Sequence, residues 1–328
     1  TINLKKGLNL IYGSNGSGKT TTLEALQILS LGKSFKTQTS SNFITKSKKQ
    51  YNIKAETNDQ NKIEVKGDFN GKTIYVNGDI IKKISQHIKF LPTIVHTPEE
   101  SVLEAKINQS RNRAINKNIS FYSTHFLKLL QNYNQTLKQR NEALKTQRTT
   151  KFWDPLFIDL AEKIWLEKHK YEKEINDKIS AENNIKEHNI RLEIRGKILN
   201  KETIIEELEQ TRNKDLKRGF TGIGPHKDLI KYFLNNLEVK TSASQGEKTI
   251  FFSQLKKAEA EHIKTKNKEP IILLDDILSK LDDSNLEKIV LLFKENTQTI
   301  ITAANPIEIR NYKKLFSSVN MNQININD

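Results

Sequence analysis

The chain has 328 residues, enough for one large or two ordinary domains with a sizeable core. Lysine and arginine (54) outnumber aspartate and glutamate (39), and the formal net charge of +15 favours polyanionic partners, nucleic acid before anionic membrane. AT-rich codon usage, which also enriches Asn and Ile, would give the same excess without any partner. The absence of cysteine excludes disulfides and a thiolate zinc site and fits a reducing compartment, so we expect the cytoplasm. No apolar run reaches the roughly 18 residues of a membrane span, and no membrane partner is expected.

A phosphate-binding loop is predicted near the start of the chain. Residues 13–20, G-S-N-G-S-G-K-T, lie between an apolar run at 8–12 and a helical pattern at 22–29, which is the context of a P-loop. Glycines let backbone N–H groups turn inward toward an anion, and the following helix directs the positive end of its dipole at the same point. Lys19 is expected to reach the β- and γ-phosphates of ATP and to act in catalysis, while the Thr20 hydroxyl holds Mg²⁺. A glycine-rich turn that only caps a helix is the alternative. The predicted nucleotide-binding residues here are Gly13, Ser14, Asn15, Gly16, Ser17, Gly18, Lys19, Thr20 and Thr21.

Residues 1–98 are predicted to form the N-terminal half of a mixed α/β ATPase lobe. Alternating runs at 51–55, 62–66 and 72–76, separated by turns rich in Asn, Asp and Gly, predict an antiparallel sheet with one solvated face. The chain opens at Thr1, inside a predicted strand, so we expect the natural chain to begin earlier.

Residues 99–215 are predicted to form an inserted, mainly helical lobe. Apolar residues recur at helical spacing from Phe126 to Leu144 and again from Phe157 to Ile179, with Lys- and Glu-rich outer faces. These stripes indicate packing of the lobe rather than a cofactor site. Because helices of roughly 30 residues span only about 45 Å, the insert is expected to be a small lobe and not a long coiled-coil rod.

Residues 216–328 are predicted to return to α/β structure and to complete the ATPase lobe. Four apolar residues at 271–274 precede Asp275 and Asp276, a Walker B pattern in which the first carboxylate faces the Mg²⁺ held by Thr20. The second carboxylate then lies where it can orient or deprotonate the attacking water, and it is the predicted catalytic partner of the P-loop lysine. An Asp pair that merely ends a strand at a turn is the alternative. The predicted metal ligands are Thr20 and Asp275.

The spacing of these motifs is unusual. Lys19 and Asp275 are 256 positions apart, which predicts one ATPase lobe split by an inserted domain. Residues 275–282 resemble the Walker B and D-loop of ABC-type ATPases, and residues 244–247, S-Q-G-E, resemble their signature motif, which in that class points at a γ-phosphate bound by a second subunit. The same four residues form a capping box worth about 1 kcal/mol to its helix, and a serine-led helix start can also bind an anion. The predicted nucleotide contacts of this motif are Ser244 and Gly246.

The chain as a whole resembles the RecF family of bacterial recombination mediators. The stretches that carry the resemblance, in the family's order, are 7–13, 23–25, 31–36, 97–100, 137–141, 224–228, 244–246 and 273–276. The resemblance implies an ABC-type P-loop ATPase lobe with an inserted second lobe, and a head-to-head dimer that depends on ATP. It also implies DNA binding at gaps and single-strand/duplex junctions, and a role with RecR-containing complexes in loading RecA. Two features depart from the pattern: Glu247 stands where many relatives have glutamine, and Thr302 or Asn305 stands where transporter-type ABC ATPases carry a switch histidine.

Three functions compete at this point. The first is a DNA-stimulated ATPase clamp, expected to turn over slowly because Asp276 is one methylene shorter than the glutamate common in faster ABC enzymes. The second is a nucleotide-gated DNA-binding module whose hydrolysis is incidental. The third is the ATPase subunit of a membrane transporter, against which the size of the insert, the basic charge and the missing switch histidine all argue.

Overall fold

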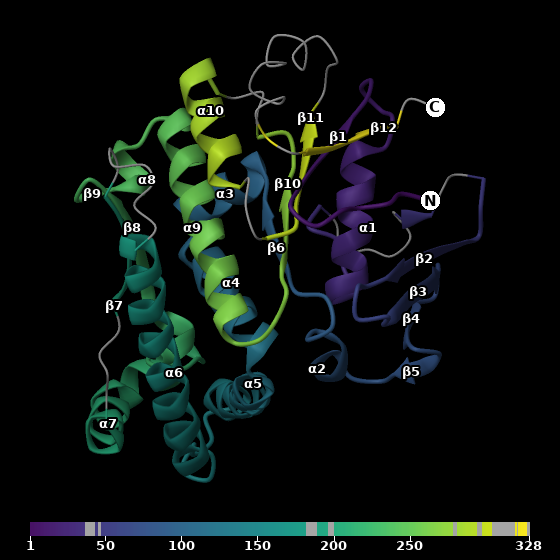
Figure 1. Ribbon diagram of the computed structural model, residues 1–328. Coiled ribbons are helices and arrows are strands. Elements are labelled where there is room, and N and C mark those ends of the chain that lie inside the picture. Colours follow the sequence, from purple (N-terminus) through teal and green to yellow (C-terminus); the bar gives the residue numbers. More distant parts are fainter. Residues whose placement is uncertain are drawn as a thin grey trace. The chain divides into compact units, whose positions relative to one another are not determined.

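The computed structural model describes residues 1–36, 43–44, 47–181, 189–195, 200–277, 281–293, 297–303, 319 and 321–326. The chain divides into two units (Figure 1). Unit 1 contains Thr1–Val102 and Ser244–Asp328, and unit 2 contains Leu103–Ala243.

A five-stranded parallel sheet forms the centre of unit 1, in the order β12-β1-β11-β10-β6. All of its strands except the edge strand β12 are mostly apolar and almost entirely buried, as expected where both faces of a parallel sheet are covered. Because all five run in the same direction, the loops that follow β1 and β10 leave at the same edge of the sheet. The strands are β1 (Leu8–Tyr12), β6 (Thr93–His96), β10 (Ile271–Leu274), β11 (Thr299–Ala303) and β12 (Met321–Asn325).

Helices cover both faces of this sheet (Figure 1). α1 (Lys19–Leu31) lies on one side, and α9 (Gln245–Thr265) packs on the other against β6 and β10, with α10 (Asp283–Leu292) beside it. α3 (Pro98–Lys106) follows β6 and crosses the limit between the two units. None of the helices in the described part of the chain is long and apolar enough to cross a membrane.

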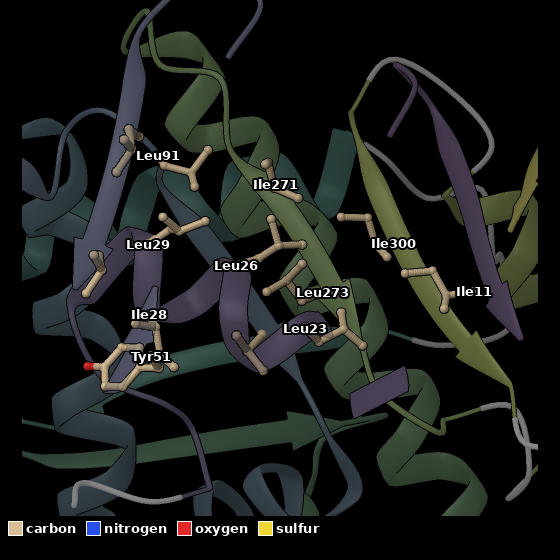
Figure 2. Packing of buried hydrophobic residues seen from close by; sticks show 13 residues of the cluster. Ile11, Leu23, Leu26, Ile28, Leu29, Tyr51, Leu91, Ile271, Leu273 and Ile300 are labelled. Carbon is tan, nitrogen blue, oxygen red and sulfur yellow. The ribbon is translucent and has the colours of Figure 1, made fainter. Parts of the chain in front are cut away.

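The antiparallel sheet predicted from alternation is confirmed. It comprises β2 (Gln50–Glu56), β3 (Lys62–Asp68), β4 (Lys72–Val76) and β5 (Asp79–Ile81), followed by the short helix α2 (Ile84–His87). α1 is buried between this sheet and the parallel one: Figure 2 shows Leu23 and Leu26 of α1 near Leu273 of β10, and Ile28 near Tyr51 of β2. Each such side chain contributes roughly 1.5–3 kcal/mol on burial, so the helix that begins at the P-loop is firmly anchored.

Unit 2 combines helices with a small antiparallel sheet. The predicted helical stripes form α5 (Thr124–Lys145) and α6 (Asp154–Ala181), which pack together. The other elements are α4 (Asn108–Tyr122), β7 (Ile190–Arg195), α7 (Lys201–Arg218), η2 (Pro225–Lys227), β8 (Leu229–Leu234), β9 (Leu237–Glu238) and α8 (Val239–Ser242). Unit 2 begins at Leu103, close to the expected limit at 98/99, but it ends at Ala243 instead of 215/216, because β7 pairs along its whole length with β8, which lies beyond residue 216.

Residues 224–228, one of the family-like stretches, form a buried corner of unit 2. Gly224 has φ 132°, and a Cβ there would lie 2.4 Å from the Tyr133 hydroxyl, so only glycine fits. The Lys168 ammonium donates to Asp228 Oδ2 at 2.7 Å and to the Pro225 carbonyl at 2.9 Å. This corner is held by buried polar contacts, and its role within unit 2 is structural.

Candidate nucleotide-binding site

The loop between β1 and α1 has the backbone that a P-loop requires. Gly16 and Gly18 have φ values of 88° and 97°, a region that residues with a Cβ rarely adopt. The N-cap of α1 is Gly18, and within the described chain no side chain caps this helix start. Its first N–H groups are therefore left for another acceptor, and together with the helix dipole they suit an anion. Thr21, exposed in the first turn, belongs to this helix start.

Lys19 lies over the same loop. Its ammonium donates to the carbonyl oxygens of Gly13 at 2.8 Å and Ser14 at 2.7 Å. Because an ammonium has three N–H donors, one remains for a phosphate oxygen. The Ser17 hydroxyl is buried and has no hydrogen-bond partner among the described residues. An unpartnered buried hydroxyl in a loop of this kind fits a bound phosphate, whereas a loop that only capped a helix has no use for it.

The first Walker B aspartate meets the P-loop helix. The hydroxyls of Thr20 and Thr302 both donate to Asp275 Oδ1, at 3.0 and 2.8 Å. Burial raises the pKa of the Asp275 carboxyl, which is 5% exposed, and these two hydrogen bonds and the Lys36 ammonium partly oppose that rise. A buried carboxylate oxygen beside a threonine hydroxyl suits a hard divalent cation.

No cluster of three or more His, Cys, Asp or Glu side chains that could hold a metal occurs in the described residues. Mg²⁺ at phosphate sites takes only one or two carboxylates and completes its shell with phosphate oxygens and water. The Thr20–Asp275 pair therefore fits Mg²⁺ bound together with a nucleotide, but not a metal held by protein side chains alone.

The second Walker B aspartate lies at the rim of the site. Asp276 has φ 50°, in the left-handed region, and its backbone N–H donates to the Thr302 hydroxyl at 2.9 Å. The same hydroxyl donates to Asp275, so Thr302 on β11 fixes both aspartates relative to each other. The sequence pointed to Thr302 or Asn305 in the switch region. The structure places Thr302 at the site, while Asn305 and positions 278–280 of the D-loop lie outside the described residues.

The signature-like helix start is separate from this group. The Ser244 side chain accepts from the Glu247 N–H at 3.3 Å, and the Glu247 carboxylate accepts from the Ser244 N–H at 2.7 Å, which makes a complete capping box at the start of α9. Ser244 is exposed, and no atom lies within 4 Å of the Cβ position at Gly246. The structure thus brings Thr20, Asp275 and Asp276 together but leaves this helix start open to solvent.

Two residues of the site were missed from the sequence. His96 ends β6, its carbonyl accepts from the Asp275 N–H at 3.1 Å, and its Nδ1 lies 2.8 Å from the Ser101 hydroxyl. Burial lowers the pKa of His96 to about 3. It fixes the first turns of α3 beside the Walker B strand. A lone histidine has no sequence signature. Lys36 is the second missed residue. It lies within the family-like stretch 31–36, but the sequence did not indicate what its side chain does.

The parallel sheet covered on both faces, with a P-loop and a Walker B aspartate at one edge, defines an ABC-type P-loop ATPase head. The RecF/RecN/SMC N terminal domain family matches residues 1–327. The chain is 30% identical to the DNA replication and repair protein RecF of Shewanella denitrificans over 93% of this chain and 88% of that protein. It is 29% identical to RecF of Clostridioides difficile over 97% and 90%. The chain belongs to this family and, within it, to the RecF proteins, which confirms the resemblance seen in the motifs.

Solved structures agree with this assignment. The recombination mediator protein RecF–ATP of the RecFOR pathway matches with a TM-score of 0.81 and 26% identity, over 93% of this chain and 87% of that one. An Smc head domain from Pyrococcus furiosus matches at a TM-score of 0.51 and 16% identity over 94% of this chain and 86% of that one, a likeness of fold alone.

Proposed function

We propose that the protein is an ATP-dependent DNA-binding protein of recombinational repair and replication restart, acting in the cytoplasm. The observation that carries this proposal is the 3.0 Å contact between Thr20 and Asp275, which joins the P-loop to the Walker B strand across the whole insert. Two further observations support it: relatives along nearly the whole chain are DNA replication and repair proteins, and a solved RecF structure with ATP shares the fold.

ATP and Mg²⁺ are the proposed cofactors. The N–H groups of residues 13–18 and the first turn of α1 would hold the phosphates, with Lys19 contributing its free donor and Ser17 its hydroxyl. Thr20 and Asp275 would hold Mg²⁺, which neutralises phosphate charge when bound. Asp276 would orient or deprotonate the attacking water. Its short side chain and constrained backbone support slow hydrolysis that acts as a switch and that DNA stimulates.

We further propose that two copies pair head to head around ATP. The exposed helix start at Ser244 and Gly246 makes its capping-box hydrogen bonds within its own helix, and a helix start suits an anion. Each pocket would be completed by this helix of the second copy, and hydrolysis would reopen the pair. The proposed partners are single-stranded, double-stranded and gapped DNA, a RecR-type mediator and the RecA filament machinery, with unit 2 as the inserted lobe.

A second candidate, the nucleotide-gated module with incidental hydrolysis, is favoured by the exposure of Asp276. Lys19→Arg and Asp276→Asn separate the two in assays of DNA binding and RecA loading. If hydrolysis acts as the switch, Asp276→Asn should bind ATP and DNA but should fail to release the DNA and to support further RecA loading. Normal loading by this variant would make hydrolysis dispensable.

Sedimentation with and without ATP, repeated with gapped DNA, tests the clamp itself. We expect a monomer without ATP and a dimer with it, and Ser244→Arg should abolish pairing while leaving ATP binding intact. Ser244→Ala is the matched control, costing about 1 kcal/mol of helix capping without blocking the approach of a second copy. A monomer under every condition, or ATP-induced pairing by Ser244→Arg, would remove the clamp.

A further inference from the structure

Three segments of unit 2 converge on one buried guanidinium. Arg140 on α5 is 2% exposed, and its Nε donates to Asp154 at the start of α6 at 2.8 Å. Its Nη1 donates to the Thr221 hydroxyl at 2.6 Å and lies 3.8 Å from Asp215 in the last turns of α7. The turn between α5 and α6, the end of α7 and the segment that follows α7 are therefore fixed around the same point.

Contacts near the surface show that these segments lie side by side. The Gln147 side-chain amide, in the turn after α5, donates to the Leu216 carbonyl of α7 at 3.0 Å. Asn141 Oδ1 accepts from the Thr221 N–H at 2.8 Å and from its hydroxyl at 2.7 Å. The exposed residues of 146–153 and of 216–220 are therefore neighbours on the surface of unit 2.

Charges on this surface are sorted by sign. Asp154 and Asp215 turn inward to Arg140, and Asp228 is paired with buried Lys168. The remaining acid of 140–154 and 212–228, Glu142, is exposed and lies 3.7 Å from Lys145. Apart from Glu142, the charged side chains of these two segments that are exposed are cationic. Those flanking the junction, all exposed, are Arg148 and Lys151 in the turn and Lys217 and Arg218 at the end of α7.

Two aromatic rings lie among these cations. Phe152 is 83% exposed and stands edge-on to Trp153, with ring centroids 5.5 Å apart. Phe220 is 40% exposed, and the Lys227 ammonium lies 4.9 Å from its ring centroid. A phenylalanine as exposed as Phe152 gains little for the fold, whereas exposed rings among lysines and arginines are how proteins bind unpaired bases and their phosphates.

We propose that this basic-aromatic face, made of Arg148, Lys151, Phe152, Lys217, Arg218 and Phe220, binds single-stranded DNA. The cations neutralise phosphates and the two phenylalanines stack on bases. Single strands are favoured over duplex because base faces are covered in a duplex, and nucleic acid is favoured over an acidic protein because carboxylates need no stacking ring. The inference rests on the proposed DNA-binding function and adds a location and a preferred strand form.

The chain carries its own reporter for this face. It has two tryptophans, of which Trp165 is 3% exposed and Trp153 contacts Phe152. Titration of the full chain with oligo-dT of about 15 nucleotides should quench Trp153 fluorescence, and the quenching should disappear in Trp153→Phe while affinity measured by anisotropy is nearly kept.

Two variants and their controls test the face. Phe152→Ala should weaken oligo-dT binding about tenfold with no change in salt dependence. Lys217→Ala/Arg218→Ala should lower the slope of log affinity against log salt by about 1.4, because each phosphate contact on a single strand contributes about 0.7. The matched controls are Phe69→Ala, at a 63% exposed ring of unit 1, and Lys170→Ala/Lys173→Ala on the exposed side of α6; both should bind like the parent chain.

The outcomes separate this inference from the proposed function. If the parent chain binds DNA but both face variants bind oligo-dT unchanged, the location is wrong and the DNA-binding function stands. If the parent chain binds neither oligo-dT nor gapped duplex with ATP present, both fail. If the double variant keeps DNA binding but loses binding to polyglutamate, the face recognises an acidic protein and the proposal is overturned.

Discussion

Two aspartates, one in each unit, are almost equally buried and differ in what surrounds them. Asp228 in unit 2 is 4% exposed and is bonded by the Lys168 ammonium and the Trp165 indole N–H, each at 2.7 Å. Asp275 in unit 1 is 5% exposed, and two hydroxyls donate to one of its oxygens. Asp228 is paired with a buried countercharge, the Lys168 ammonium. Among the described residues Asp275 has no such ion pair, and burial raises the pKa of its carboxyl.

The difference distinguishes structure from function. A buried ion pair whose hydrogen bonds are satisfied is self-contained and orders the elements around it. A buried carboxylate that is hydrogen-bonded only by hydroxyls, with its cation at a distance, costs free energy until a bound cation arrives, so its retention points to a ligand. On this criterion residues 224–228 are a structural corner, and the Walker B strand end has the properties of a ligand site, as proposed above.

The largest expected effect is the loss of stability when the buried Lys168–Asp228 ion pair is broken. Lys168→Met removes the countercharge of Asp228 and should cost about 3–5 kcal/mol of unfolding free energy, measured by urea denaturation. Lys170→Met, at an exposed position of the same helix, is the control and should change stability by less than about 0.5 kcal/mol. Lys168→Met/Asp228→Asn should recover part of the loss. A cost below 1 kcal/mol for the single variant would mean that the pair does not hold the corner.

Removing the charge of Asp275, by contrast, should not destabilise the ligand-free protein. Asp275→Asn should leave the ligand-free protein at least as stable at pH 7, because the raised pKa means that the charged form is disfavoured in the fold. The variant should lose most of the stabilisation by Mg²⁺–ATP, which for the parent chain at 100 times Kd is about 2.7 kcal/mol. Thermal unfolding with and without Mg²⁺–ATP measures both, with exposed Asp79→Asn as the control. An unfolded Asp275→Asn variant would contradict the comparison.

The sequence predicted the elements well where a local pattern carries them. The glycine loop, the apolar run before Asp275 and the helical stripes of α5 and α6 are visible because period, glycine and proline placement act over a few residues. Pairing between distant segments has no such signal. The Lys168–Asp228 pair, the β7–β8 ladder that carries unit 2 past residue 216, and the role of Thr302 all depend on sheet order and packing. The roles of Lys19, Asp276 and Ser244 stay predictions.

Two buried histidines, one in each unit, extend the comparison to pH. Burial lowers the pKa of His96 to about 3 and that of His226 to about 4, against about 6.5 in an unfolded chain. Both side chains are neutral in the folded protein. Their contribution to the free energy of unfolding is therefore complete above pH 6.5, and it is lost as the pH falls from 6.5 toward the folded pKa values. Each should cost about 2 kcal/mol between pH 6.5 and 5.

The slope of stability against pH, rather than stability itself, is the readout for these histidines. His226→Gln gives up the 2.6 Å contact with the Tyr133 hydroxyl at any pH, but it should also flatten the slope by about 2 kcal/mol over that range. Exposed His125→Gln is the control. An unchanged slope in His226→Gln would show that this histidine protonates in the folded protein.

The smallest expected effect comes from the electrostatic field of Lys36 at the Asp275 carboxylate. The Lys36 ammonium opposes the rise in the pKa of Asp275. The backbone of Lys36 is held in place because its N–H donates to the Ser34 hydroxyl at 2.9 Å. That hydroxyl donates to the Glu24 carboxylate. Because Lys36 is exposed, its field is worth no more than about 1 kcal/mol, so Lys36→Ala should weaken Mg²⁺–ATP binding up to about fivefold at low salt.

This effect should fade as salt is raised, since exposed charges are screened beyond the Debye length of about 10 Å at 0.1 M. Lys62→Ala, at an exposed position of β3, removes the same charge from the same unit and should leave affinity unchanged. Calorimetric titration at two salt concentrations decides the matter. A loss of affinity that persists at high salt would mean that Lys36 contacts the nucleotide directly. Asp275 would then have a cation close by in the bound state, in addition to its two hydroxyl partners.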